Sequence, residues 1–357
     1  MFAPVSWGQG LNVRLDRRQV LLGAASAAFA GALARAETLP PIAQDVALLG
    51  APDGILEGKI AALAGEAGLR VGFAAVDLVK GRTAFVRGGE LFPMQSVTKL
   101  PIAVAYLRMV QGGQAKLDAR VRLTAGDISP GRSPLADKLR RRPTVFTARQ
   151  LMEHMLLNGD STATDALMKL AGGPEKLQTI VRSFEIEGLR VDRYERDLQP
   201  QALGLELKGA YGDDAALDKA VEALDETKQR AALTRFIRDP RDTASPRAIA
   251  TLFFKLQSGH LIQPRFAMLV LDLMRRTRTG EDRLKGGMLP GWTFAHRGGT
   301  SRTVLGTTAV FNDAGLATNK QGAKLAIVLF IEGATMAAEE LARFHRATSR
   351  AVLQAWG

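Results

Sequence analysis

The sequence has no cysteine, few histidines and few aromatic residues. Its 357 residues include 4 His, and aromatic side chains make up 6% of the chain. The absence of cysteine excludes disulfides and thiolate chemistry and disfavours a structural zinc site. The histidines lie far apart and show no HExxH spacing, so we expect no metal site. The motifs GxGxxG and GxxxxGK[ST] are also absent, so we expect no nucleotide or other cofactor.

Basic residues exceed acidic ones along the whole chain. The sequence has 48 Lys and Arg against 36 Asp and Glu, a formal charge of +12. The basic residues are scattered and have no aromatic residues between them that could stack on bases, so we expect no nucleic-acid partner. Hydrophobic residues make up 46%, as in ordinary globular proteins, and the length is sufficient for one or two domains with a large core.

The N-terminus has the pattern of an export signal. In "RLDRRQVLLGAASAAFAGALARA", the adjacent Arg17 and Arg18 precede an apolar stretch of 20–33 and a small-x-small cleavage pattern at 34–36. We predict that residues 1–36 are a twin-arginine signal and that the mature protein is periplasmic or otherwise exported. A general secretory signal or an uncleaved anchor is the alternative. No later stretch is long and apolar enough to span a bilayer, so we expect no stable membrane insertion after signal removal.

The order of the predicted elements indicates one sheet built from both ends of the chain. A helix is expected over about 54–67, and a hairpin is expected around the turn at Lys80-Gly81. Residues 99–257 have an almost entirely helical pattern. Strands return in "GWTFAHR", "TVLGTTAVFN" and "AKLAIVLFIE", and a last helix covers about 336–356. We predict an α/β (α+β) fold in which an antiparallel sheet is flanked by helices and an all-α domain is inserted.

The pair of candidate catalytic residues that comes closest to a known sequence motif is Ser96 and Lys99, in "FPMQSVTKLP". Pro93 stops any earlier helix, so Ser96 lies near a first helical turn, and residues three apart share a helix face. A lysine in a partly buried position favours its neutral form and accepts a serine proton, while the helix start offers N–H groups to an oxyanion. Ser96 as a simple helix cap is the alternative.

The same stretch resembles the active-site helix of class A β-lactamases and related penicillin-recognising serine hydrolases. Four later stretches resemble this family in the same order: "MEHMLLNGDSTATDALMKLAGG", "VDRYERDLQ", "DPRDTASPRAIATLFFKLQSGHL" and "TGEDRLKGGMLPGWTFAHRGGTS". Together they cover the chain from about residue 54 to its end. The resemblance implies a β-lactamase/transpeptidase-like fold, with a sandwich domain of residues 37–98 and 262–357. It also implies an all-α domain of residues 99–261 that contains the omega loop.

The resemblance also implies residue roles. Ser96 would be the nucleophile, Lys99 its base, and Glu195 the group that activates the deacylating water; a solvated loop glutamate is the plain alternative for Glu195. The substrate would contact a further set of residues, namely Asp160, Ser161, Gln199, Arg297, Gly299 and Thr300. We therefore expect a monomeric hydrolase for a small-molecule substrate, either a β-lactam or a cell-wall-like amide.

Several positions depart from the family pattern. Gly159 and Ser161 stand where the second motif has serine and asparagine, and Arg297-Gly298 stands where the third has lysine and a hydroxyl residue. An extra segment, 200–238, reads as one or two helices beside the site. Two rival functions stay open, and the lost hydroxyls at Gly159 and Gly298 favour the first of them. One is a Ser–Lys esterase, amidase or peptidase with another substrate, and the other is a catalytically weak binding protein for β-lactams or cell-wall fragments.

Overall fold

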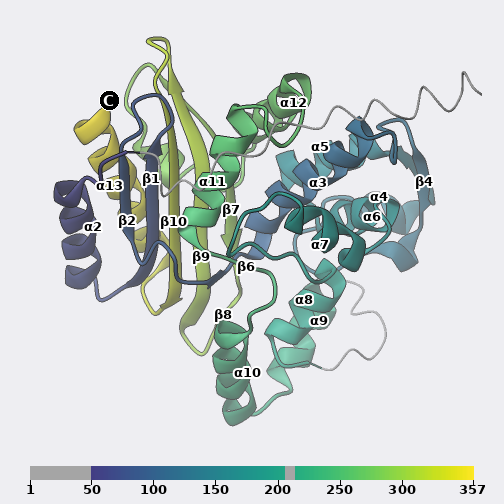
Figure 1. The fold of residues 1–357 in the computed structure, drawn as a ribbon. Coiled ribbons are helices and arrows are strands. Elements are labelled where there is room, and N and C mark those ends of the chain that lie inside the picture. Colours follow the sequence, from purple (N-terminus) through teal and green to yellow (C-terminus); the bar gives the residue numbers. More distant parts are fainter. Residues whose placement is uncertain (1–49, 206–213) are drawn as a thin grey trace, which may run out of the picture. The chain divides into compact units, whose positions relative to one another are not determined.

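A computed structural model describes residues 50–205 and 214–357 of the chain (Figure 1). The predicted export signal, residues 1–36, lies outside the described residues, and so does the first part of the predicted sandwich domain. Within the two described ranges, no helix combines the length and the apolar character needed to cross a membrane.

The predicted sheet is confirmed. Its strands are antiparallel and run in the order β2-β1-β10-β9-β7, and β8 pairs with β9. The first hairpin and the late strands fall in the expected stretches, although β9 is longer than its sequence pattern suggested. The strands are β1 (Arg70–Asp77), β2 (Thr83–Val86), β7 (Trp292–Thr300), β8 (Thr303–Val304), β9 (Thr307–Asn319) and β10 (Lys324–Ala334).

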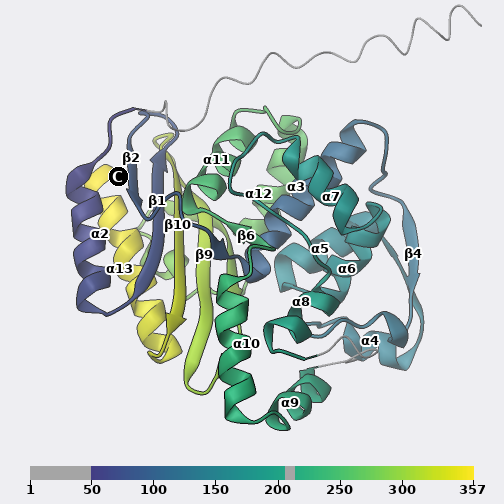
Figure 2. The same ribbon diagram turned by 60° about the horizontal axis from the view of Figure 1, so that its bottom comes forward.

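The two faces of the sheet pack against different helices. Helix α2 (Gly54–Glu66) and helix α13 (Ala338–Trp356) cover one face, as Figures 1 and 2 show. Because side chains alternate along a strand, Phe73 and Ala75 of β1 join the hydrophobic cluster with these helices. Ala74 and Val76 point the other way, into the larger cluster that contains the helical middle of the chain. The middle of the chain therefore sits on one side of the sheet only.

The middle of the chain is mostly helical, as predicted, but it also contains short strands that the sequence pattern did not reveal. These are β3 (Phe92–Pro93) paired with β6 (Thr243–Ala244), and β4 (Arg120–Leu123) paired with β5 (Thr144–Thr147). Runs of two to four residues are too short to show a two-residue period. The helices are α3 (Lys99–Gln111), α4 (Ala136–Arg141), α5 (Ala148–Asn158), α6 (Ser161–Leu170), α7 (Pro174–Arg182), α11 (Pro246–Gln257) and α12 (Pro264–Arg275). The division into a sandwich and an all-α domain stays a prediction.

The described parts of the extra segment are helical. They follow α8 (Glu195–Ala202) and consist of α9 (Asp214–Glu222) and α10 (Glu226–Arg238). Asp225 caps α10 by accepting a hydrogen bond from the backbone N–H of Lys228. Phe236 of α10 packs with Leu198 of α8 and with Val310 of β9, which fixes α10 between the loop helix and the sheet. Figure 2 shows α9 and α10 side by side near α8.

Candidate active site

Ser96 and Lys99 lie where the first helical turn of this region begins. A 3₁₀ turn over Gln95–Thr98 leads directly into α3, which starts at Lys99. Gln95 has a φ of +50°, a conformation that residues other than glycine rarely adopt and that is concentrated at functional sites. The Lys99 Nζ lies 3.0 Å from the Ser96 Oγ, so the predicted contact exists. Ser96 is half-buried, whereas Lys99 is completely buried, and this burial lowers the pKa of Lys99.

Glu195, the first residue of α8, completes a chain of polar contacts that starts at Ser96. Its Oε1 forms an ion pair with the Lys99 Nζ, and its Oε2 accepts a hydrogen bond of 2.8 Å from the Gln199 Nε2. The same Gln199 nitrogen also donates to the Gln95 Oε1 at 3.1 Å. Burial raises the pKa of the Glu195 carboxyl, but the charge and hydrogen bond of Lys99, the hydrogen bond of Gln199 and the charge of Arg297 together outweigh it, so the net pKa is lowered. Glu195 is therefore an ionised base that contacts Lys99.

Asp165, which the sequence motifs did not single out, fixes the backbone at Glu195. Its Oδ1 accepts a hydrogen bond of 2.7 Å from the Glu195 N–H, and its Oδ2 accepts hydrogen bonds from the Arg196 N–H and the Ser129 hydroxyl. Burial raises the pKa of Asp165 to about 6. Asp165 lies four residues after Ser161 on α6, hence on the same helix face. That spacing was the one signal in the sequence that could have identified it.

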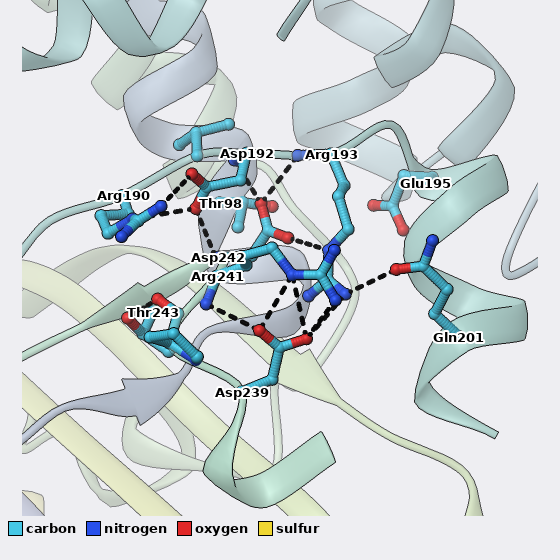
Figure 3. Close-up of polar contacts among 12 residues, drawn as sticks. Thr98, Arg190, Asp192, Arg193, Glu195, Gln201, Asp239, Arg241, Asp242 and Thr243 are labelled. Carbon is cyan, nitrogen blue, oxygen red and sulfur yellow. Dashed lines mark hydrogen bonds and ion pairs between the residues drawn. The ribbon is translucent and has the colours of Figure 1, made fainter. Parts of the chain in front are cut away.

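A network of arginine and aspartate side chains closes the loop that carries Glu195 (Figure 3). Asp242 accepts hydrogen bonds from the backbone of Asp192 and Arg193 and from the Arg193 Nε at 2.6 Å. The Arg193 Nη1 also donates to Gln201 and to Asp239, at 2.9 and 3.0 Å. The stretch that resembles the omega loop and the later stretch that contains Asp239 and Asp242 are thus joined directly. The extra segment leaves the loop near Gln201 and rejoins it near Asp239.

Asp160 and Ser161, predicted for the second motif, stand at the start of α6. Asp160 caps this helix by accepting from the Ala163 N–H at 2.8 Å, and its other oxygen accepts from the Leu135 N–H at 2.7 Å. It therefore holds the loop before α4 against α6, while its predicted contact with the substrate stays a prediction. The Ser161 side chain is buried. Among the described residues it forms no hydrogen bond with Lys99, the contact that asparagine is expected to make there.

Arg297 and Gly159 occupy one common space. The Arg297 side chain is buried and donates from Nη1 to the Leu156 carbonyl oxygen and to the Thr279 hydroxyl, each at 3.2 Å. Its Nη2 lies where a side chain at Gly159 would begin, so a Cβ built on Gly159 would overlap it. Burial lowers the pKa of Arg297 to about 10, which leaves the group charged at neutral pH. Gly159 and Arg297 both depart from the family pattern, and they are therefore two parts of one structural change.

Gly299 and Thr300 end strand β7 beside Ser96. Gly299 touches the backbone of the nucleophile turn: a Cβ on it would overlap the Met94 carbonyl oxygen and lie 3.2 Å from the Ser96 nitrogen. Thr300 is exposed, and its hydroxyl accepts a hydrogen bond from the buried Arg283. Arg283 was not predicted, and no local pattern marks it. Together with Arg297 it makes this end of β7 positively charged.

One pocket adjoins this group of residues. Gln95, Gln199, Ser301 and Arg302 line its polar side, and α10 and the β8–β9 region supply an apolar side that includes Leu233, Phe236 and Val304. A larger pocket, of about 860 Å³, lies elsewhere, between α7 and α11, and none of the predicted site residues lines it. The geometry of the polar contacts, rather than pocket size, locates the candidate site at Ser96.

The chain is similar to known proteins over most of its length. The sequence model of the β-lactamase enzyme family matches residues 55–356. The chain belongs to this family. A β-lactamase from Streptomyces albus G is 28% identical over 85% of each chain, and a carbapenem-hydrolysing β-lactamase, KPC, from Klebsiella oxytoca is 27% identical over 80% of each. The predicted family resemblance is thereby confirmed.

The fold of the family agrees with the structure described above. An ancestral class A β-lactamase superposes with a TM-score of 0.68 at 26% identity, covering 84% of this chain and 100% of the other. A β-lactamase from Chitinophaga pinensis, at 24% identity, gives the same TM-score of 0.68 and supports the fold alone. The chain is a class A β-lactamase-like hydrolase by family.

Proposed function

We propose that the protein hydrolyses β-lactam amides through an acyl-enzyme on Ser96. The observation that carries the proposal is the continuous chain of contacts from the Ser96 hydroxyl through Lys99 and Glu195 to Gln199. A nucleophile in contact with a base that is itself held by a third group is the arrangement expected of covalent acyl transfer.

The first half of the reaction is acylation. Lys99 takes the proton of Ser96 when it is in its amine form, which its lowered pKa makes more accessible; its Nζ lies 3.0 Å from the hydroxyl. Glu195 acting through a water is the alternative base for this step. The serine oxygen then attacks the strained amide carbonyl, and as the tetrahedral intermediate collapses the C–N bond breaks and the leaving nitrogen takes the proton that Lys99 received from Ser96. The backbone N–H groups of Ser96 and Thr300 stabilise the resulting oxyanion, with Gly299 allowing the two backbones to approach.

The second half is deacylation. Glu195 is ionised and is oriented by two neighbours, Gln199 at its Oε2 and Asp165 at its backbone N–H. It abstracts a proton from a water that attacks the acyl carbonyl, and the serine leaves with that proton. The substrate carboxylate binds near Thr300, where the charges of Arg297 and Arg283 lie beneath the surface.

A second function is favoured by a specific observation. Arg297 fills the space in which the family serine at position 159 would carry its hydroxyl, so no proton relay to a β-lactam nitrogen exists there. A Ser–Lys esterase, amidase or peptidase that acts on another substrate would not need that hydroxyl.

Intact-mass analysis separates the two candidates. We expect incubation with a penicillin to add one acyl group to the wild-type protein, and Ser96→Ala to abolish it. Ser258→Ala, at an exposed serine after α11, is the matched control and should leave the adduct unchanged. Turnover of a chromogenic cephalosporin supports the β-lactamase. Hydrolysis of simple esters with neither adduct nor turnover supports the second function, and an undiminished adduct in Ser96→Ala refutes Ser96 as nucleophile.

The site of action is proposed to be outside the cytoplasm. Arg17→Lys combined with Arg18→Lys should leave the precursor inside the cell with residues 1–36 attached, because the twin-arginine route requires both guanidinium groups. Immunoblotting of cell fractions measures this. Normal processing of the double variant would indicate the general secretory route.

A further inference from the structure

The extra segment contacts two separate sides of the Ser96 site through a single carboxylate. Asp214, the first residue of α9, accepts a hydrogen bond of 2.7 Å at its Oδ1 from the Gly131 N–H. The same oxygen accepts a 2.7 Å hydrogen bond from the Arg302 Nη2. Asp218, one turn further along α9, forms an ion pair with the Arg302 Nη1. We call these three side chains, Asp214, Asp218 and Arg302, the α9 strap.

The two attachment points belong to two segments that lie close to the residues around Ser96. Gly131 belongs to the loop beside Ser161 and Gln199: a Cβ on it would lie 3.0 Å from the Ser161 Oγ and 3.5 Å from the Gln199 Cγ. Arg302 follows Thr300 by two residues, in the turn from β7 to β8. Both segments adjoin the Ser96 turn, since Gln199, beside Gly131, bonds to Gln95, and Gly299, shortly before Arg302, touches the Ser96 amide.

We propose that the α9 strap determines substrate specificity by restricting the size of the group that enters beside Ser96. A substrate whose acyl side chain extends between Gly131 and Arg302 must displace Asp214 from one of them. A substrate without such a side chain reacts with the strap in place. This inference rests on the proposed function, because it requires Ser96 to be the acylated residue.

The ion pairs and the hydrogen bond of the α9 strap are of a kind that can break. The side chains of Asp214 and Asp218 are about half exposed, at 48% and 52%, and that of Arg302 is 27% exposed. Ion pairs with this exposure stabilise weakly and are screened by salt. We therefore expect the strap to slow the entry of a bulky substrate by about 10-fold, since either the hydrogen bond to Gly131 or the weak pairs with Arg302 must be broken.

The test uses two β-lactams that differ only in the acyl side chain: 6-aminopenicillanic acid, which has none, and a penicillin with a fluorescent acyl group. The rate of Ser96 acylation is measured by intact mass for the wild type, for Asp214→Ala with Asp218→Ala, and for Arg302→Ala. The control is Glu222→Ala, which removes a negative charge from the exposed side of α9 and leaves the strap intact.

Both strap variants should acylate about 10-fold faster with the bulky penicillin and within about 2-fold of the wild type with 6-aminopenicillanic acid. Glu222→Ala should change neither rate. In the wild type alone, 0.5 M NaCl should accelerate the bulky reaction, a measurement that needs no variant to fold. Equal changes for both β-lactams, or no change and no salt effect, would overturn the strap while Ser96 is still acylated. Absence of any Ser96 adduct in every protein would instead remove the proposed function and the strap with it.

Discussion

The shared space of Gly159 and Arg297 makes a quantitative prediction about restoring the family pattern. Gly159→Ser places a Cβ where the Arg297 Nη2 now lies. The guanidinium must then move by about 1 Å or more to reach an ordinary contact distance. Such a movement breaks one of the two hydrogen bonds that Nη1 donates to the Leu156 carbonyl and the Thr279 hydroxyl, which are both already long at 3.2 Å. The serine must also adopt the φ of +71° that glycine has there.

Gly159→Ser has two costs, the left-handed backbone conformation and the lost hydrogen bond of Arg297. Only the second depends on Arg297. The left-handed conformation costs a non-glycine residue about 1 kcal/mol in any background. Losing one hydrogen bond of a buried charged group costs about 2 kcal/mol, and only while Arg297 is present. We therefore expect Gly159→Ser to destabilise the protein by about 3 kcal/mol alone and by about 1 kcal/mol in an Arg297→Lys background. The coupling free energy between the two substitutions is then about 2 kcal/mol.

A double-mutant cycle in urea at pH 7 measures this coupling. The control is Gly113→Ser, because Gly113 has a φ of +69° and open space around its Cα, so it reports the conformational cost alone. Additive free energies of unfolding, within about 0.5 kcal/mol, would refute the shared-space argument. The double variant should also hydrolyse a chromogenic cephalosporin faster than the wild type. A positioned proton donor contributes about 10²–10⁴-fold to a rate, and we expect a sizeable part of that range.

Three further predictions concern groups away from the nucleophile. Burial lowers the pKa of His345 to about 3 from an unfolded value of 6.5, so its contribution to stability is complete above pH 6.5 and is lost as the pH falls toward 3. Between pH 7 and pH 4.5 the free energy of unfolding in urea should therefore fall by about 3 kcal/mol less for His345→Gln than for the wild type, and parallel pH profiles would contradict this. Arg193→Ala leaves the Asp242 carboxylate buried and unpaired, which should lower the free energy of unfolding by about 3–5 kcal/mol, and a loss below 1 kcal/mol would show that solvent replaces the pair. Asp165→Ala releases the backbone of Glu195 and should slow deacylation more than acylation, so that a penicillin adduct persists in intact-mass spectra; equal slowing of both steps would indicate general unfolding of the site.

Local patterns predicted the features that depend on local geometry. The contact of Lys99 with Ser96 follows from a spacing of three residues at a helix start, and the first hairpin follows from alternation around a Lys-Gly turn. The helices that cover one sheet face were also predictable, because their apolar residues recur at helical spacing.

The missed features depend on where long side chains end after the chain has folded. The Arg297 side chain reaches Gly159, which lies 138 positions earlier in the sequence. The sequence alone shows these two positions as separate departures from the family pattern. The Arg283 contact with Thr300 and the Asp214 contact with Gly131 likewise join segments that share no pattern. A tertiary contact of this kind is set by backbone packing, which composition and periodicity do not encode. The short strands β4 and β5 were missed for a different reason, since four residues do not establish a period.

The contacts of the Arg193 guanidinium bear on how the extra segment is inserted in the loop. Its Nη1 binds both Gln201 and Asp239, so the points where the extra segment leaves and rejoins the omega loop lie side by side. A segment whose two ends meet at one place adds length without stretching the host structure, and such places are where insertions are tolerated. The loop with Glu195 is closed by Arg193 and Asp242 independently of what lies between Gln201 and Asp239. The segment therefore joins the loop at a place where its length can change without moving Glu195.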